Sequence, residues 1–210
     1  MKNNSDVKIM LKEALVLLII TLGAGLLLGF VYELTKEPIA RQQELAIQRA
    51  CGEVFEEADS FAEYSLQLTE DTLTLIQDKG VSIGTVYEAK DAEGRLLGYV
   101  VEAISEEAYA GDIVLYAGIT TSGKLNGISI LEISETPGLG MLAEKVLVPQ
   151  FADKAVESFT YTKTGSTSES EIDAISGATI TTKAVTNAVN GALVAVQDIL
   201  QTNGMAKEGQ

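Results

Sequence analysis

The sequence predicts an α+β protein in which a single N-terminal transmembrane helix precedes a domain made of an antiparallel sheet and a C-terminal helix. Three observations predict this class: a long uncharged apolar run near the N-terminus, several short alternating segments separated by turn residues, and an amphipathic helical pattern near the C-terminus. The chain has 210 residues, 46% of them hydrophobic, which suffices for one domain with its own core and an additional segment. We expect a tail and transmembrane helix over residues 1–33, a helical connector over 34–60 and the main domain over 61–210.

The apolar run extends from Ala14 to Tyr32 without a charged residue, which is long enough for a helix to cross the hydrocarbon core of a bilayer. A cleaved signal peptide is the alternative, but its apolar core is normally only about 7–15 residues long. More basic residues precede the run than closely follow it, namely Lys2, Lys8 and Lys12. Because the basic side usually stays inside, we expect a single-pass anchor in the lipid of the cell membrane, with the main domain extracytoplasmic.

Good helix formers fill residues 37–58, with Pro38 in the expected first turn, and predict the helical connector. Beyond it, short apolar or alternating runs predict five strands, at Thr72–Gln77, Val81–Ala89, Leu96–Ile104, Ile113–Thr120 and Gly127–Ile133. Glycine-containing segments at 90–95 and 120–127 are typical of hairpin turns, which favours an antiparallel sheet. Two helices are expected after the strands, at Met141–Val148 and at Thr182–Gln201, the second with one apolar stripe.

Composition excludes several kinds of chemistry. A formal net charge of −15 would repel a phosphate backbone, so we expect no nucleic-acid partner. The chain has no His and one Cys, which excludes His-based triads, His-ligated zinc or haem, and an intrachain disulfide. We identify no catalytic residue and no metal site, so redox chemistry would need an organic cofactor. The clustered carboxylates are interpreted as a solvated acidic face, namely Glu53, Glu56, Glu57, Glu106 and Glu107.

The segment DAISGAT, from Asp173 to Thr179, places four small residues before the C-terminal helix: Ser176, Gly177, Ala178 and Thr179. The free N–H groups and the dipole of a helix N-terminus suit a phosphate group. The alternative is that a hydroxyl simply caps the helix, from Ser176, Thr179, Thr181 or Thr182.

A second unusual segment, ETPGLG, runs from Glu135 to Gly140 directly after the last expected strand. Proline fixes φ, and two glycines would let the backbone approach a flat ligand closely. The alternative is a strand-to-helix turn without a ligand.

With the N-terminal anchor, these two segments make the chain resemble RnfG, the FMN-binding subunit of the Rnf electron transport complex. More distantly, the chain resembles NqrC, a subunit of the sodium-pumping NADH:quinone reductase. The resemblance covers nearly the whole chain. In this family a flavin transferase attaches FMN, through a phosphoester, to the last Thr of a D-x-x-S/T-G-A-T motif, which implies covalent FMN on Thr179. It also implies that the isoalloxazine ring is bordered by Glu135, Thr136, Gly138, Leu139 and Gly140.

Further residues complete the candidate cofactor site. Ser176, Gly177 and Ala178 are small enough for the phosphate and the modifying enzyme to approach, and Thr182 lies beside them. Tyr109, next to Gly111, is a candidate stacking residue or else a tyrosine at a strand edge. Lys183, one turn into the helix, is a candidate partner of the phosphate or else a solvated residue. One departure from the family is Ser134, which stands where many relatives carry His.

The resemblance implies a membrane-anchored flavoprotein that relays electrons within an ion-translocating ferredoxin:NAD oxidoreductase complex. Its partners would be the other membrane and peripheral subunits of that complex, the flavin transferase that matures it and membrane lipid. It would be a redox subunit of a translocase rather than an enzyme that acts alone. Two alternatives remain open: a free-standing tethered flavoprotein that passes electrons to an external acceptor, and a flavin-free anchored binding domain.

Overall fold

The computed structural model describes residues 4–208 and divides the chain into two compact units, residues 1–45 and residues 46–210. The first element, helix α1 (Asn4–Val54), supplies the whole described part of the first unit and the beginning of the second. The region expected to form a connector, 34–60, is therefore shared between the two units. Helix α1 is the one helix among residues 4–208 that is long and apolar enough to cross a membrane.

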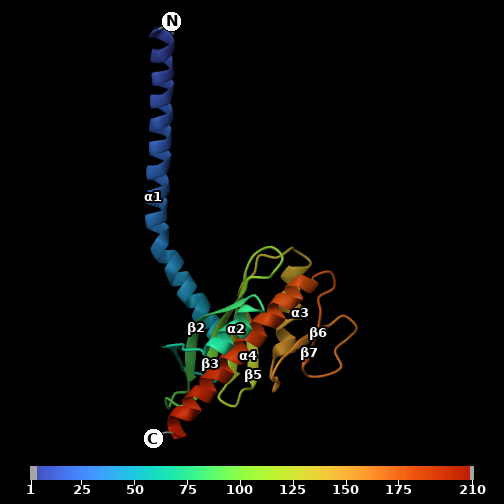
Figure 1. The fold of residues 1–210 in the computed structure, drawn as a ribbon. Coiled ribbons are helices and arrows are strands. Elements are labelled where there is room, and N and C mark those ends of the chain that lie inside the picture. The colour runs from blue at the N-terminus through green and yellow to red at the C-terminus, as the bar shows by residue number, and fades with distance from the viewer. Residues whose placement is uncertain (1–3, 209–210) are drawn as a thin grey trace. The chain divides into compact units, whose positions relative to one another are not determined.

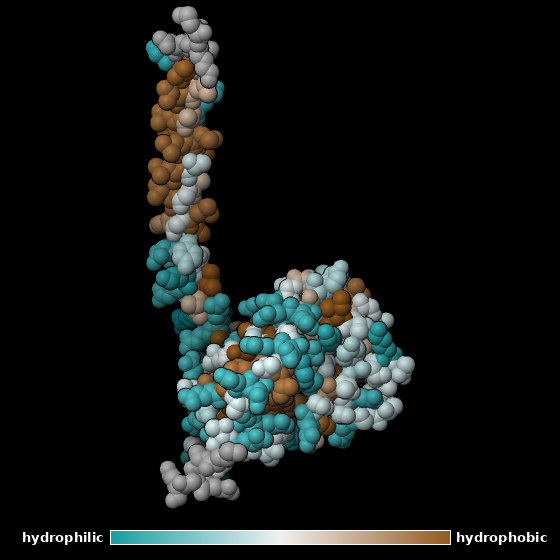
Figure 2. Space-filling view, viewed as in Figure 1, coloured by the Kyte–Doolittle hydropathy of each residue, from teal (hydrophilic) through white to brown (hydrophobic). Residues whose placement is uncertain are grey.

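The apolar stretch of α1 forms a continuous hydrophobic band along the helix (Figure 2), and the side chains from Val7 to Leu45 are exposed. Two hydroxyls within or next to this stretch bond back to the helix: Thr21 to the Leu17 carbonyl and Thr35 to the Val31 carbonyl, both at 3.0 Å. These bonds satisfy hydroxyls that lipid could not satisfy. This segment therefore has the length, composition and internal hydrogen bonding of a single-pass anchor.

Pro38 lies inside α1 and not in the first turn of a separate helix, so that part of the prediction is wrong. A proline inside a helix removes one backbone hydrogen bond, here to the Leu34 carbonyl. Strong helix formers on both sides let the helix continue past this single defect, because each further residue adds one hydrogen bond.

The second unit contains one antiparallel sheet with strands in the order β1-β2-β3-β4-β5 (Figure 1). The strands are β1 (Ser60–Tyr64), β2 (Val81–Lys90), β3 (Leu96–Ser105), β4 (Ile113–Thr120) and β5 (Leu125–Glu132). Four of them agree with the expected strands, and the two expected hairpin turns join β2 to β3 and β4 to β5. The edge strand β1 was not predicted.

The expected strand Thr72–Gln77 is instead part of helix α2 (Glu70–Gln77), so this prediction is wrong. Thr69 caps the helix, since its hydroxyl accepts from the Thr72 N–H at 3.4 Å, and acidic residues fill the first turn. Thr72 and Ile76, four residues apart, are the buried positions. Burial at a spacing of four is helical and overrides the alternating composition of the segment.

Successive side chains of a strand point to opposite faces of the sheet, and both faces are covered by helical segments. On one face Val101 and Leu115 pack under the C-terminal helix α4 (Thr179–Glu208), which crosses the sheet in Figure 1. On the other face Val100 and Tyr116 pack against residues 50–55, the end of α1 and the residue after it. The sheet is therefore buried on both sides, and its core forms around α4.

The segment between β5 and α4 is irregular. In place of one expected helix over Met141–Val148, the structure has three short pieces, η1 (Gly140–Leu142), α3 (Ala143–Val146) and η2 (Val148–Phe151). Pro149 near the start of η2 interrupts a continuous helix. A short parallel pair follows, β6 (Thr160–Thr162) and β7 (Glu171–Asp173), and α4 begins three residues earlier than expected.

Candidate functional site

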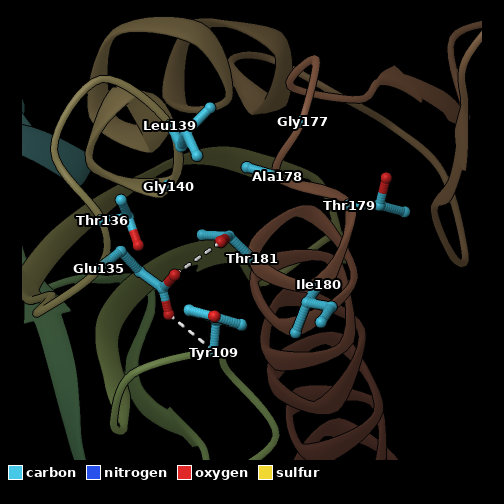
Figure 3. A pocket seen from close by; sticks show the side chains of 10 residues that line it. All are labelled: Tyr109, Glu135, Thr136, Leu139, Gly140, Gly177, Ala178, Thr179, Ile180 and Thr181. Carbon is cyan, nitrogen blue, oxygen red and sulfur yellow. Dashed lines mark hydrogen bonds between the residues drawn. The ribbon is translucent and has the colours of Figure 1, made fainter.

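Three segments that are distant in sequence meet at one end of the sheet. In the antiparallel order, the β3–β4 loop, the segment after β5 and the start of α4 surround a pocket of about 470 Å³ (Figure 3). The pocket is lined by Tyr109, Glu135, Thr136, Leu139, Gly140, Gly177, Ala178, Thr179, Ile180 and Thr181. The two segments singled out in the sequence, ETPGLG and DAISGAT, therefore contribute to one cavity.

Glu135 holds these segments together. Its side chain is only 6% exposed, and its Oε1 accepts hydrogen bonds from the backbone N–H groups of Tyr109 at 2.8 Å and Ala110 at 3.2 Å. Its Oε2 accepts a hydrogen bond from the Thr181 hydroxyl at 2.9 Å, as Figure 3 shows. One buried carboxylate thus joins the β3–β4 loop, the ETPGLG turn and the first turn of α4.

Glycine is required at the two glycine positions of ETPGLG for different physical reasons. A Cβ on Gly140 would lie 2.6 Å from Glu135 Oε2 and from Thr181 Oγ1, so only glycine leaves room for that contact. Gly138 has a φ of +78°, a conformation that L side chains rarely adopt, and a Cβ there would meet no atom within 4 Å. Gly138 is thus required by the turn, and Gly140 by the close packing against Glu135.

Thr179 is the first residue of α4 and lines the pocket with its side chain partly exposed. In Figure 3 it lies at the edge of the group, apart from Glu135, Thr136 and Thr181. Its hydroxyl makes no hydrogen bond to any residue that the structure describes. A free hydroxyl at the N-terminus of a long helix is well placed to carry an anionic substituent, because the helix dipole favours negative charge there.

Thr182 does not cap the helix, because its hydroxyl bonds to the segment before α4 and not to the free N–H groups of the first turn. Its hydroxyl accepts from the Ile175 N–H at 3.1 Å and donates to the Ala178 carbonyl at 2.9 Å. Thr182 is fully buried and does not line the pocket. Thr182 therefore fixes the path of the chain before α4, whereas Thr179 is the threonine of the motif that lines the pocket.

Four other residues singled out in the sequence do not line the pocket, namely Ser134, Gly138, Ser176 and Lys183. Lys183 forms an ion pair with Glu107, Nζ to Oε2 at 2.8 Å, and this contact raises the pKa of the lysine. Ser134, Ser176 and Gly138 are exposed. Lys183 therefore has a carboxylate partner already.

Two residues of the pocket were not among the predicted site residues. Ile180 is 50% exposed, and Thr181 was considered only as a helix cap. Ile180 falls off the apolar stripe of its helix, and a large apolar residue outside such a stripe is the signal that could have identified it. Thr181 offers no such signal, because its partner Glu135 is 46 residues away in the chain.

The residues present fit a flat aromatic ligand with an anionic end. The volume lies in the range of small-molecule sites. Three large side chains at the rim remain exposed: Tyr109 at 68%, Leu139 at 40% and Ile180 at 50%. These offer contact area to a ring, and the start of α4 offers N–H groups to a phosphate.

Comparisons with known proteins agree with this arrangement. The family model of the FMN-binding domain matches residues 108–194, and that of the RnfG N-terminal region matches residues 1–54. The G subunit of the Na(+)-translocating ferredoxin:NAD(+) oxidoreductase complex of Acetobacterium woodii is 32% identical, over 92% of this chain and 95% of its own. The G subunit of the ion-translocating oxidoreductase complex of Methanosarcina acetivorans is 31% identical, over 90% of this chain and 95% of its own.

Two further comparisons are weaker in coverage or identity. The G subunit of the proton-translocating ferredoxin:NAD(+) oxidoreductase complex of Clostridium ljungdahlii is 33% identical, over 81% of this chain and 82% of its own. The crystal structure of NqrC from Shewanella oneidensis is 20% identical with a TM-score of 0.47, over 56% of this chain and 59% of that one.

Proposed function

The chain belongs to the RnfG family of the ion-translocating oxidoreductase complexes, and from this premise we propose that it holds FMN at the pocket and relays electrons within such a complex. One observation carries the proposal: Thr179 of DAISGAT and the ETPGLG turn line the same cavity. The domain also matches the FMN-binding family over the residues that build this cavity from Tyr109 onward.

Thr179 is the proposed point of covalent attachment, through a phosphoester between its hydroxyl oxygen and the flavin phosphate. Its hydroxyl has no partner to give up among the described residues, and the start of α4 stabilises the added negative charge. Gly177 and Ser176 are exposed beside it, which leaves room for a flavin transferase to approach. The ester tethers the phosphate end and leaves the ring free to lie in the pocket.

The protein contributes binding and orientation, and the bound FMN supplies the electron transfer chemistry. Leu139, Ile180 and Tyr109 provide apolar contact area for the ring and exclude water from it. Glu135, Gly140 and Thr181 keep the walls of the pocket in register. This division of roles is that of a redox subunit and requires no acid–base residue from the chain.

We also propose the place of the protein in the cell. Helix α1 spans the cell membrane once, with lipid around its apolar band, and the FMN-binding domain lies outside the cytoplasm. Covalent attachment suits that location, where unbound FMN would be lost. The partners are the other membrane and peripheral subunits of the complex and the transferase that attaches the flavin.

The test is the intact mass of the protein purified from a membrane that contains its native transferase. Attachment adds the mass of FMN less one water, with the visible absorbance of a flavin. Thr179→Val should abolish both, whereas the control Thr202→Val, an exposed threonine on the same helix, should change neither. Flavin retained in Thr179→Val, or mapped to Ser176 or Thr181, would contradict the assignment. Co-purification of other subunits distinguishes a complex from a free-standing flavoprotein.

A further inference from the structure

We propose that Glu135 is the positioning and charge-setting residue of the flavin site: its buried carboxylate orients the first turn of α4 and lowers the reduction potential of the bound flavin. This inference rests on the proposed function, since it concerns a flavin in the same pocket. It assigns to the carboxylate a role that neither the turn geometry nor the attachment motif requires.

The positioning role follows from the contacts of Glu135. Its two oxygens accept three hydrogen bonds from two other segments, the β3–β4 loop and the first turn of α4. The bond to Thr181 lies two residues after the attachment residue Thr179, so it fixes the helical turn that carries the tether. Gly140 closes over the same contact, because any side chain there would collide with both partners.

The charge-setting role follows from what is missing around the carboxylate. Among the side chains that the structure describes, residues 7–204, no lysine or arginine nitrogen lies within 4 Å of the Glu135 carboxylate, and its three hydrogen-bond partners are neutral donors. The nearby cation Lys183 is paired with Glu107 instead. A negative charge with 6% exposure is poorly screened, so it opposes the addition of electrons to a group in the same pocket.

Glu135→Gln separates the charge from the geometry. The amide has the same length, its oxygen can accept from Tyr109 and Ala110, and its NH₂ can donate to the Thr181 hydroxyl. Thr181→Val is the converse variant, because it removes the hydrogen bond that positions α4 and keeps the carboxylate. Glu157→Gln, an exposed carboxylate outside the pocket, is the control for the change in net charge.

The experiment measures three properties of each full-length variant. These are the FMN bound per protein by intact mass, the midpoint potential by redox titration of the visible absorbance, and the urea midpoint of unfolding in a flavin-free Thr179→Val background. We expect Glu135→Gln to load FMN and to shift the potential upward. Thr181→Val should keep the low potential and unfold at lower urea, and Glu157→Gln should match the wild type in all three.

The outcomes separate this inference from the proposed function. If the wild type carries no FMN, the proposed function fails. If Glu135→Gln carries FMN at an unchanged potential, the charge-setting role is overturned although the function stands. If Glu135→Gln does not fold, Thr181→Val decides: a raised potential in this charge-retaining variant would overturn the role, and an unchanged urea midpoint would overturn the positioning.

Discussion

The side-chain amide of Gln150 bonds to both backbone polar groups of Asp173. Its Oε1 accepts from the Asp173 N–H at 2.7 Å, and its Nε2 donates to the Asp173 carbonyl at 3.2 Å. The same Nε2 donates to the Val146 carbonyl at 2.7 Å. The Asp173 carboxylate points elsewhere and accepts from the Ser166 N–H at 2.5 Å. The first residue of DAISGAT is thus held by η2 and by the loop before β7, and it reaches the pocket only through the backbone that follows it.

Replacing Gln150 should therefore disturb the attachment segment from outside the pocket. Gln150→Leu leaves the Asp173 N–H and carbonyl without partners, which should lower the free energy of unfolding by about 1–3 kcal/mol. We also expect a smaller fraction of protein carrying flavin, measured by intact mass. Gln201→Leu, at an exposed position of α4, is the control and should change neither quantity. Full stability in Gln150→Leu would refute the role of these bonds.

Gly138 is expected to tolerate asparagine and not valine. Its φ of +78° is accessible to Asn, whereas a β-branched residue there is strained by about 1–3 kcal/mol and should displace the turn. Gly138→Val should keep FMN on Thr179 but change the visible absorbance and slow reduction, and Gly138→Asn should resemble the wild type. An unchanged spectrum and rate in Gly138→Val would mean that the ETPGLG turn does not border the ring.

Gly140→Ala should destabilise the domain, because its Cβ would lie 2.6 Å from Glu135 Oε2 and Thr181 Oγ1. The expected loss is about 1–3 kcal/mol in urea unfolding, as for other overpacked sites. Gly127→Ala is the matched control, since a Cβ there meets no atom within 4 Å and its φ is not positive. Equal stability of the two variants would show that the contact around Glu135 can open without cost.

Burial of the Cys51 thiol should make the free energy of unfolding depend on pH in the alkaline range. Burial, with a smaller effect of the Glu102 carboxylate, raises the pKa of its thiol from 9.0 to about 12. Because the pKa is higher in the folded state, the contribution of the neutral thiol is complete below pH 9 and is lost as the pH rises toward 12. The difference in unfolding free energy between the wild type and Cys51→Ala should be constant from about pH 7 to pH 9 and should change above it, in the direction of a less stable wild type. A constant difference up to about pH 11 would refute the burial of the thiol.

The proposed topology predicts that protease added to intact cells without their wall removes the FMN-binding domain. The basic residues Lys2, Lys8 and Lys12 before the apolar band favour a cytoplasmic N-terminus. A cytoplasmic protein should stay intact in the same cells, which controls for lysis. Full protection of the domain would reverse the orientation, and a mature protein beginning near Lys36 would identify the segment as a cleaved signal.

The elements with long, regular patterns could be predicted from the sequence, namely the apolar helix, strands β2 to β5 and helix α4. Edge strand β1 could not, since none of its residues is buried and a buried face is what creates alternation. Strands β6 and β7 are too short to carry any period. In α2, Thr and Leu alternate as they would in a half-buried strand. The segment is helical because of the tertiary contacts of Ile76, which a local pattern does not show.

In the candidate site, too, some features could be predicted from the sequence and others could not. DAISGAT and ETPGLG are local signals, so their contribution to a pocket could be expected from composition and from family resemblance. The Glu135–Thr181 bond joins residues 46 positions apart, and no local pattern encodes such a pair. The sequence does not distinguish the hydroxyls of Thr179 and Thr182. In the structure, the Thr182 hydroxyl bonds to Ile175 and Ala178, whereas the Thr179 hydroxyl has no hydrogen-bond partner among the described residues.

The order of elements along the chain also bears on when the protein can mature. Helix α4 follows every strand of the sheet, and it covers strands β2, β3 and β4 on one face. During synthesis the strands leave the ribosome before their cover exists, so this face has no stable packing until the helix emerges. Thr179 is the first residue of that last helix. If flavin is attached there as proposed, it is added to a polypeptide whose strands have already been translated.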